Sequence, residues 1–281
     1  MCTTTAGAKA ALGVALNRVD PNGASTAKML ACPDKNAFDY DGCTSETLAD
    51  GTKVMVYQGY EYPDRRVPTK SWRATLVTAQ GYQVDVQEWN AAAEKGEPVS
   101  RPHPPLDAAQ LKALALSPLW RPALEDLPAA HPESPRSAPR PGASVGPVLD
   151  GLLAGYGIPV VAKGDEGYSA YAVLDDGKGK SMVSVEVQSV GKAGPVDSLF
   201  AGAAVMPDGT KVVTRQEPGE KGGKNVVWWT VDTLRTDGTR VIVSAFNSKN
   251  QESDASRKEP ALTMAQLKEM ATSSTWVQYA K

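Results

Sequence analysis

Histidine is nearly absent from the sequence: His103 and His131 are the only two among 281 residues. Both lie in proline-rich segments, so neither stands beside a Ser or Cys that it could activate as a base. This argues against a His-dependent hydrolase. No Gly-x-x-x-x-Gly-Lys-Ser/Thr loop and no Rossmann fingerprint occurs either. We therefore predict no catalytic residues, no metal ligands and no cofactor.

The sequence also lacks a strong charge imbalance and long apolar runs. Thirty Lys plus Arg stand against thirty-two Asp plus Glu, a net charge of -2, which creates no general attraction to nucleic acid or anionic lipid. No stretch approaches the roughly 18 consecutive apolar residues of a membrane helix, and residues 1–11 lack the pattern of a signal peptide. We expect no nucleic-acid partner and no membrane span within this chain. An anchor upstream of residue 1 is compatible with that expectation.

Cysteine is scarce, but two of the three cysteines are informatively placed. Cys32 and Cys43 flank a polar, turn-rich segment. A disulfide across a loop of about a dozen residues would stabilise the fold by roughly 2 to 3 kcal/mol, and such bonds persist in oxidising compartments. We predict a Cys32–Cys43 disulfide, an unpaired Cys2 and an extracytoplasmic location. Two unpaired thiols are the alternative.

What the sequence does contain is an internal repeat. The pentapeptide Asp-Gly-Thr-Lys-Val at residues 50–54 recurs at residues 208–212, and residues 106–112 align with residues 262–268. Further matches keep nearly the same spacing: Trp72 with Trp229, Gly81 with Gly238, Val84 with Val241, Val86 with Val243, Asn90 with Asn247 and Trp120 with Trp276. This steady spacing predicts two copies of one domain.

The start of the first copy is clarified by the second. Residues 9–19 are rich in alanine and would be taken for a helix, but they align with residues 180–190, where β-branched residues alternate with polar ones. Both segments are therefore predicted to be strands with one buried face. In the first copy the cysteine loop follows as an insertion.

The second copy predicts an α+β fold, an antiparallel sheet packed by a C-terminal helix. Its expected elements are a helix at 147–154, strands at 168–174, 182–190, 211–216, 226–234 and 240–246, and a closing helix that starts at the N-cap Thr263.

The predicted domains are residues 1–120, a proline-rich linker at 121–144 and residues 145–281. The first copy lacks counterparts of the first helix and first strand, and we expect that it is truncated at its start.

Candidate binding residues come from what the two copies do not share. Tryptophans common to both copies are expected to be core anchors, whereas the unshared Trp228 points to the face opposite Trp229 and is the better surface candidate. Asp175 and Asp176 are the only adjacent carboxylates at a loop that a ligand could reach. We take Trp228, Asp175 and Asp176 as the candidate binding residues.

Several motifs carry a resemblance to known proteins. They are Asp-Asp-Gly-Lys-Gly-Lys at 175–180, Pro-Asp-Gly-Thr at 207–210, Leu-Thr-x-x-Gln-Leu at 262–267 and Ser-x-x-Trp at 273–276. The second copy resembles the extracytoplasmic domains of actinobacterial, streptomycete-like, membrane- or lipid-anchored proteins. The first copy departs from them at its start and in its cysteine loop. The resemblance implies a location outside the membrane and a binding or sensing role, with no catalytic residues.

These observations favour a non-enzymatic, extracytoplasmic binding or sensing module of the cell envelope, whose partner is an unknown protein or envelope ligand. The alternative is a secreted inhibitor or partner-binding protein that acts through loops such as residues 32–43. A carboxylate-dependent enzyme ranks third. An acidic deep pocket would favour the enzyme, and a flat aromatic patch would favour the binding functions.

Overall fold

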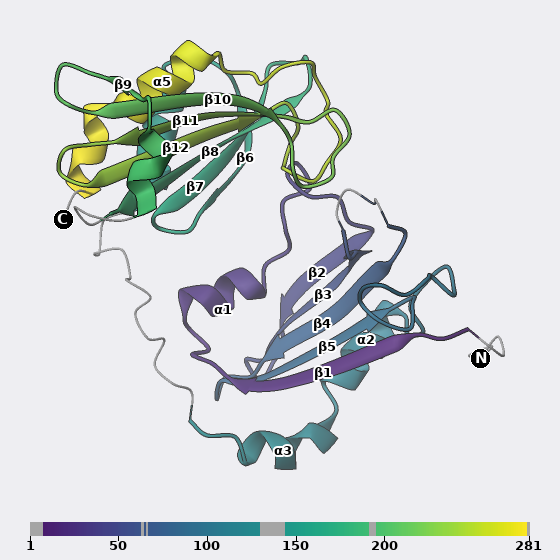
Figure 1. The fold of residues 1–281 in the computed structure, drawn as a ribbon. Coiled ribbons are helices and arrows are strands. Elements are labelled where there is room, and N and C mark those ends of the chain that lie inside the picture. The colour runs from purple at the N-terminus through teal and green to yellow at the C-terminus, as the bar shows by residue number, and fades with distance from the viewer. Residues whose placement is uncertain (1–7, 63–64, 66, 130–143, 191–194, 280–281) are drawn as a thin grey trace. The chain divides into compact units, whose positions relative to one another are not determined.

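The computed structural model describes residues 8–62, 65, 67–129, 144–190 and 195–279, and the chain divides into two compact units (Figure 1). The first unit comprises residues 1–35 and 39–136, and the second comprises residues 36–38 and 137–281. Each unit contains one antiparallel sheet packed by helices, which confirms the predicted α+β class. Among the described residues, no helix is long and apolar enough to cross a membrane.

The sheet of the first unit has five strands in the order β1-β5-β4-β3-β2. The strands are β1 (Ala11–Arg18), β2 (Gly42–Thr47), β3 (Lys53–Tyr60), β4 (Lys70–Val77) and β5 (Tyr82–Trp89). The helices of this unit are α1 (Ala24–Met29), α2 (Ala108–Ala115), the 3-10 helix η1 (Pro118–Trp120) and α3 (Arg121–Glu125).

The sheet of the second unit has seven strands in the order β6-β7-β8-β12-β11-β10-β9. The strands are β6 (Val160–Asp165), β7 (Ser169–Asp175), β8 (Lys180–Ser189), β9 (Ala204–Val205), β10 (Lys211–Pro218), β11 (Val227–Leu234) and β12 (Thr239–Phe246). The helices are α4 (Gly146–Ala154), η2 (Pro195–Phe200), α5 (Met264–Thr272) and η3 (Ser274–Tyr279).

The five strands of the first sheet follow the same order and register as five strands of the second. The order β1-β5-β4-β3-β2 corresponds to β8-β12-β11-β10-β9, and Ala11 pairs with Trp89 as Met182 pairs with Phe246. We call two residues at equivalent places in this correspondence matched residues. The second unit adds α4, β6 and β7, which have no counterparts in the first unit. The sequence predicted only one such additional strand. Strand β6 was missed because it contains Gly164 and a bulge that interrupts the alternation.

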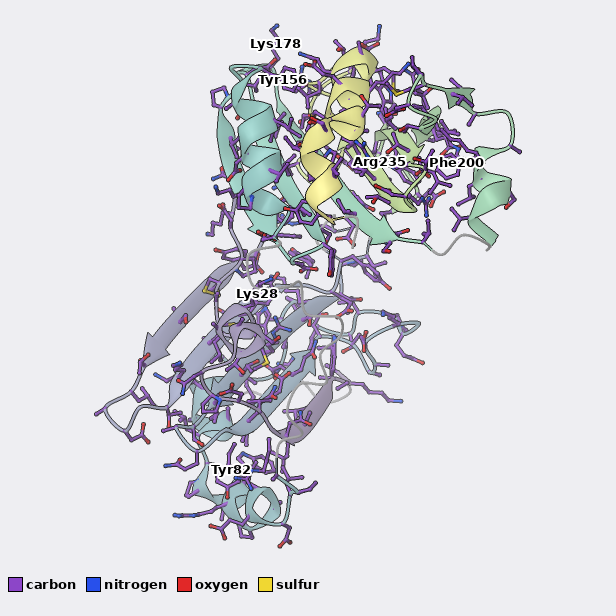
Figure 2. The ribbon with its side chains drawn as sticks, turned by 90° about the vertical axis from the view of Figure 1, so that its left-hand side faces the viewer. Lys28, Tyr82, Tyr156, Lys178, Phe200 and Arg235 are labelled. Carbon is purple, nitrogen blue, oxygen red and sulfur yellow. A yellow bond between two sulfur atoms is a disulfide. The ribbon has the colours of Figure 1, made fainter. Side chains whose placement is uncertain are left out.

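One face of each sheet is covered by a helix that follows the last strand of its unit. Helix α2 packs on β3, β4 and β5, and α5 packs on β11 and β12, while α4 covers β7. The predicted N-cap Thr263 is confirmed as part of a capping box with Gln266, and Asp107 with Gln110 forms the same arrangement at α2. Figure 2 shows α4 and α5 side by side, where the Tyr156 hydroxyl donates to the Gln266 carbonyl at 3.3 Å.

The tryptophans shared by both copies close these cores. Trp276 is fully buried, and its indole N–H donates to the Met270 carbonyl at 2.7 Å. Trp120 is half-buried and donates in the same way to the Leu114 carbonyl at 2.8 Å. Trp72 is buried and Trp229 packs against the core of its unit.

A short helix lies in the segment where the sequence predicted only a linker. Helix α3 occupies Arg121–Glu125, contacts β1 and buries Leu124 in the same cluster as Leu16. Pro122 is tolerated there because the first turn of a helix has backbone N–H groups without intrahelical partners. Residues 130–143, the centre of the predicted linker, lie outside the described residues.

Candidate functional site

The two faces of the second sheet have different surroundings. Alternate side chains of β8, β11 and β12 point toward α4 and α5, and the residues between them point to the opposite face. That opposite face contains an open hollow of about 490 Å³. We call it the open-face hollow, and its main lining residues are Met182, Trp228, Asp232, Arg240 and Phe246.

One part of the open-face hollow is aromatic. The rings of Trp228 and Phe246 lie nearly parallel, with their centroids 6.1 Å apart and an interplanar angle of 10°. The Trp228 indole N–H donates to the Ser244 hydroxyl at 3.0 Å, and buried Met182 packs with Phe246 from the neighbouring strand. Because Trp228 is only half-buried, part of its ring is available to a ligand. The hydrogen bond and the packing fix the orientation of that ring.

The other part of the hollow is charged and rigidly held. Arg240 donates from Nε to Asp232 Oδ1 at 2.9 Å and from Nη2 to Oδ2 at 2.6 Å. Its Nη1 donates to Gln188 Oε1 at 3.0 Å. The hydrogen bond to Asp232 raises the pKa of Arg240. This two-point pairing keeps a polar group of fixed geometry in the same hollow, four residues along β11 from Trp228.

The sequence-predicted binding residues separate in the structure. Trp228 lines the open-face hollow, whereas Asp175 at the end of β7 and Asp176 in the turn that follows do not line it. Asp175 Oδ1 accepts a hydrogen bond from the Gly177 N–H at 3.0 Å. Asp176 forms an ion pair with Arg257 at 2.8 Å, and the hydrogen bond from that guanidinium lowers its pKa. Both carboxylates therefore have structural partners at the turn.

The residues that accompany Trp228 were missed, although a signal for them exists. On β11, Trp228 and Asp232 share the parity of the open face, while Val231 has the parity of the core. The hairpin formed with β12 places Phe246 directly opposite Trp228. The register set by the turn at residues 235–238 would have identified this pair.

The corresponding face of the first sheet is covered. Helix α1, marked by Lys28 in Figure 2, precedes Leu30, which forms a buried cluster with Met55 and Val77 on the face opposite α2. Gln83 is matched to Arg240, and its amide donates to Met29 Sδ at 3.2 Å. Helix α1 and this cluster therefore lie on the face of the first sheet that corresponds to the open face of the second.

The segment after α1 is tied to the sheet by the predicted disulfide. Cys32 and Cys43 are bonded, with their Cα atoms 5.8 Å apart, so this prediction is confirmed. Cys43 lies on the edge strand β2 and packs against the cluster under α1. Cys2 lies outside the described residues.

Two titratable groups of the first unit, His103 and Glu88, contact neighbouring residues. The His103 ring packs 5.7 Å from the ring of Trp72, and its Nδ1 is 3.3 Å from Lys70 Nζ. Glu88 is fully buried and accepts a hydrogen bond from the Leu106 N–H at 3.1 Å. Burial raises the pKa of Glu88 to about 7. His131 lies outside the described residues.

Comparison with known proteins adds no family to these observations. No family model matches the sequence, and no curated protein matches it.

Proposed function

We propose that this chain is a non-enzymatic, extracytoplasmic binding or sensing module of the cell envelope, and that its ligand occupies the open-face hollow. The observation that carries the proposal is that the fixed pair Trp228 and Phe246 lines one hollow together with the fixed pair Asp232 and Arg240. Small-molecule sites typically combine an apolar or aromatic surface with a few oriented polar groups, in clefts of roughly 300 to 1,000 Å³. The hollow has that composition and that size.

The chemistry of the lining favours an envelope saccharide as the ligand. A sugar ring has one face rich in C–H groups, which an exposed indole face can cover, and hydroxyl groups around its edge. Arg215 and Glu186 also line the hollow and add charged hydrogen-bonding groups to it. A flat ligand with an apolar face and polar edges is complementary to this surface.

The state of the carboxylates supports binding over catalysis. Asp232 is almost fully buried and both of its oxygens accept hydrogen bonds from Arg240. A carboxylate held in this way is a poor general base, because both of its oxygens are already engaged by the guanidinium. The disulfide supports an oxidising compartment, since such bonds are rare where thiols are kept reduced.

The experiment is co-sedimentation of the purified protein with bacterial cell-wall sacculi. We expect the wild type to sediment with the sacculi. Trp228→Ser gives position 228 the residue type of its matched residue, Ser71, and should weaken binding about tenfold or more. Arg215→Gln should weaken it less, because Arg215 lines the hollow but offers a ligand no aromatic surface of the kind that Trp228 offers. Arg240 is left unchanged because its removal would leave Asp232 buried without a partner.

The matched control is Leu119→Ser, which removes a highly exposed apolar side chain of the first unit. It should bind the sacculi as the wild type does. Equal binding by wild type and Trp228→Ser, or loss of binding in Leu119→Ser, would contradict the proposed site.

A further inference from the structure

Strand β1 is an open edge of the first sheet. The N–H of Ala11 donates to Ala91 and that of Val19 to Gly81, so residues of this parity direct their backbone groups toward β5. Leu12, Val14 and Leu16 have the other parity and direct their N–H and C=O groups outward. Among the described residues β1 pairs with β5 alone.

The second unit shows the same edge covered. Strand β8 is matched to β1, and its outward side is paired with β7 over seven residue pairs. Val187, matched to Leu16, donates its N–H to the Tyr168 carbonyl at 2.8 Å. The outward backbone groups of β1 therefore have the arrangement that an antiparallel strand requires.

The side chains of β1 are also uncovered. Leu12 and Val14 are 47% and 39% exposed, while their matched residues Val183 and Val185 are each 1% exposed in the core beneath α4. Leu16, nearer the end of the strand, packs in the cluster that contains Leu124 of α3. An apolar stripe therefore runs along the helix-covered face of β1 and is shielded only at one end.

The other sheet edges carry features that discourage pairing. Strand β2 bears Glu46 in an ion pair, β6 has a bulge and bears Lys163 in an ion pair, and β9 has two residues. Charge, bulges and short length are the usual means of blunting an edge. Strand β1 has eight residues in unbroken register, contains no proline and is uncharged until its last residue, Arg18.

We propose that β1 pairs antiparallel with β1 of a second copy of this chain, about a two-fold axis at Val14. The two five-stranded sheets then form one continuous sheet. In this register Val14 faces its own equivalent, and Leu12 faces Leu16 of the second copy. All three residues have outward backbone groups, so each of these pairs exchanges hydrogen bonds.

A second copy suits this edge because the strand is complementary to itself. Leu12, Val14 and Leu16 share one face, so the two-fold axis places apolar side chains only against apolar side chains. Leu16 of the second copy brings its own cluster with Leu124 beside the exposed Leu12. An isologous contact of this kind closes at a dimer, which removes the exposed edge of both molecules.

The experiment is sedimentation velocity on the full chain over a micromolar to near-millimolar concentration series. The wild type should shift from monomer to dimer. Val14→Lys places two like charges together on the axis and should raise the dimer dissociation constant about 100-fold. The control Val205→Lys adds the same charge at an exposed position of β9 and should dimerise as the wild type does.

A cysteine variant keeps the test decisive if Val14→Lys does not fold. In a Cys2→Ser background, Val14→Cys should form an intermolecular disulfide under oxidising conditions, and Val205→Cys should not, because antiparallel neighbours lie within disulfide range. A wild type that stays monomeric throughout, or a dimer that Val14→Lys leaves intact, overturns the proposal. Capture of a different protein by an otherwise monomeric chain also overturns it, since the edge would then serve another partner.

Discussion

The two units have the same order of five strands but leave different surfaces open. In the first unit the face opposite α2 carries α1 and the cluster around Met55, while no described strand pairs with the outer edge of β1. In the second unit the matched edge is covered by α4 and β7, while the matched face contains the open-face hollow. One sheet can thus present either a face to a small ligand or an edge to another strand, depending on which short segments are added to it.

Single residues mark this difference. Ser71 stands in the first unit where Trp228 stands in the second, and Gln83 stands where Arg240 stands. The first unit therefore lacks the side chains that line the hollow in the second. Ser71 and Gln83 stand in their place, and an added segment can cover them. Four predictions follow from the comparison, in order of decreasing effect.

The largest expected difference lies between the two closing tryptophans. Trp276→Ala removes a fully buried side chain and should lower the free energy of unfolding of the second unit by about 3 to 5 kcal/mol. Trp120→Ala should cost the first unit less, because Trp120 is half-buried. Chemical denaturation followed by hydrogen exchange in each unit measures both. Equal losses would show that the two helices close their sheets with the same packing.

The disulfide should matter to the unit that contains the inserted segment. Replacing Cys32 and Cys43 together by Ser frees a loop with a sequence separation of 11, which should destabilise the first unit by about 3 kcal/mol. Thermal unfolding of the double variant beside Cys2→Ser provides the measurement and its control. A double variant as stable as Cys2→Ser would mean that α1 and its cluster hold the segment without the bond.

The buried Glu88 should give the first unit a pH dependence that the second lacks at the matched Ala245. Its pKa is raised from 4.5 to about 7, so the unfolded chain releases this proton at lower pH than the folded one. The contribution of protonated Glu88 to the stability of the folded first unit is complete below pH 4.5. It is lost as the pH rises to about 7, which lowers the free energy of unfolding by about 2 to 3 kcal/mol. Denaturation at several pH values should show that fall.

Glu88→Gln should abolish the fall between pH 4.5 and 7, because its amide does not ionise. The exposed Glu97→Gln should preserve it. A wild-type profile that rises over the same range would contradict the assignment of a raised pKa to Glu88.

The smallest effect should be the same in both units, because both helices share one capping arrangement. Asp107→Ala and Thr263→Ala each remove a side chain that accepts a hydrogen bond from the N–H three residues on. Each should cost its own unit about 1 kcal/mol. Urea denaturation of the two variants tests this, and a loss confined to one of them would show that the caps are not equivalent.

The sequence predicted the regular part of this fold well, for physical reasons. Alternation of apolar residues identified β7, β8, β10, β11 and β12, and Thr263 with Gln266 marked the start of α5. The edge strands β6 and β9 were missed because one is bulged and the other has two residues, so neither carries a clear period. Helix α3 was missed because Pro122 and the prolines after the helix were taken as linker composition, while the burial of α3 depends on a contact with β1.

The candidate site was predicted only in part. Trp228 was found because adjacent strand residues point to opposite faces and Trp229 was assigned to the core. Asp175 and Asp176 were chosen for exposure at a turn, where hydrogen bonds to Gly177 and Arg257 engage them. Recognising Asp232 with Arg240 requires the register of two strands, which a reading of each strand alone does not supply.

The central claim is that ligand binding belongs to the open face of the second unit. The six tryptophan indole N–H groups of a ¹⁵N-labelled sample report on both units at once. On addition of solubilised cell-wall glycan fragments, the account predicts a concentration-dependent shift of the Trp228 signal, with the signals of Trp72, Trp89 and Trp120 unchanged. A shift at those three signals with Trp228 unaffected would contradict it.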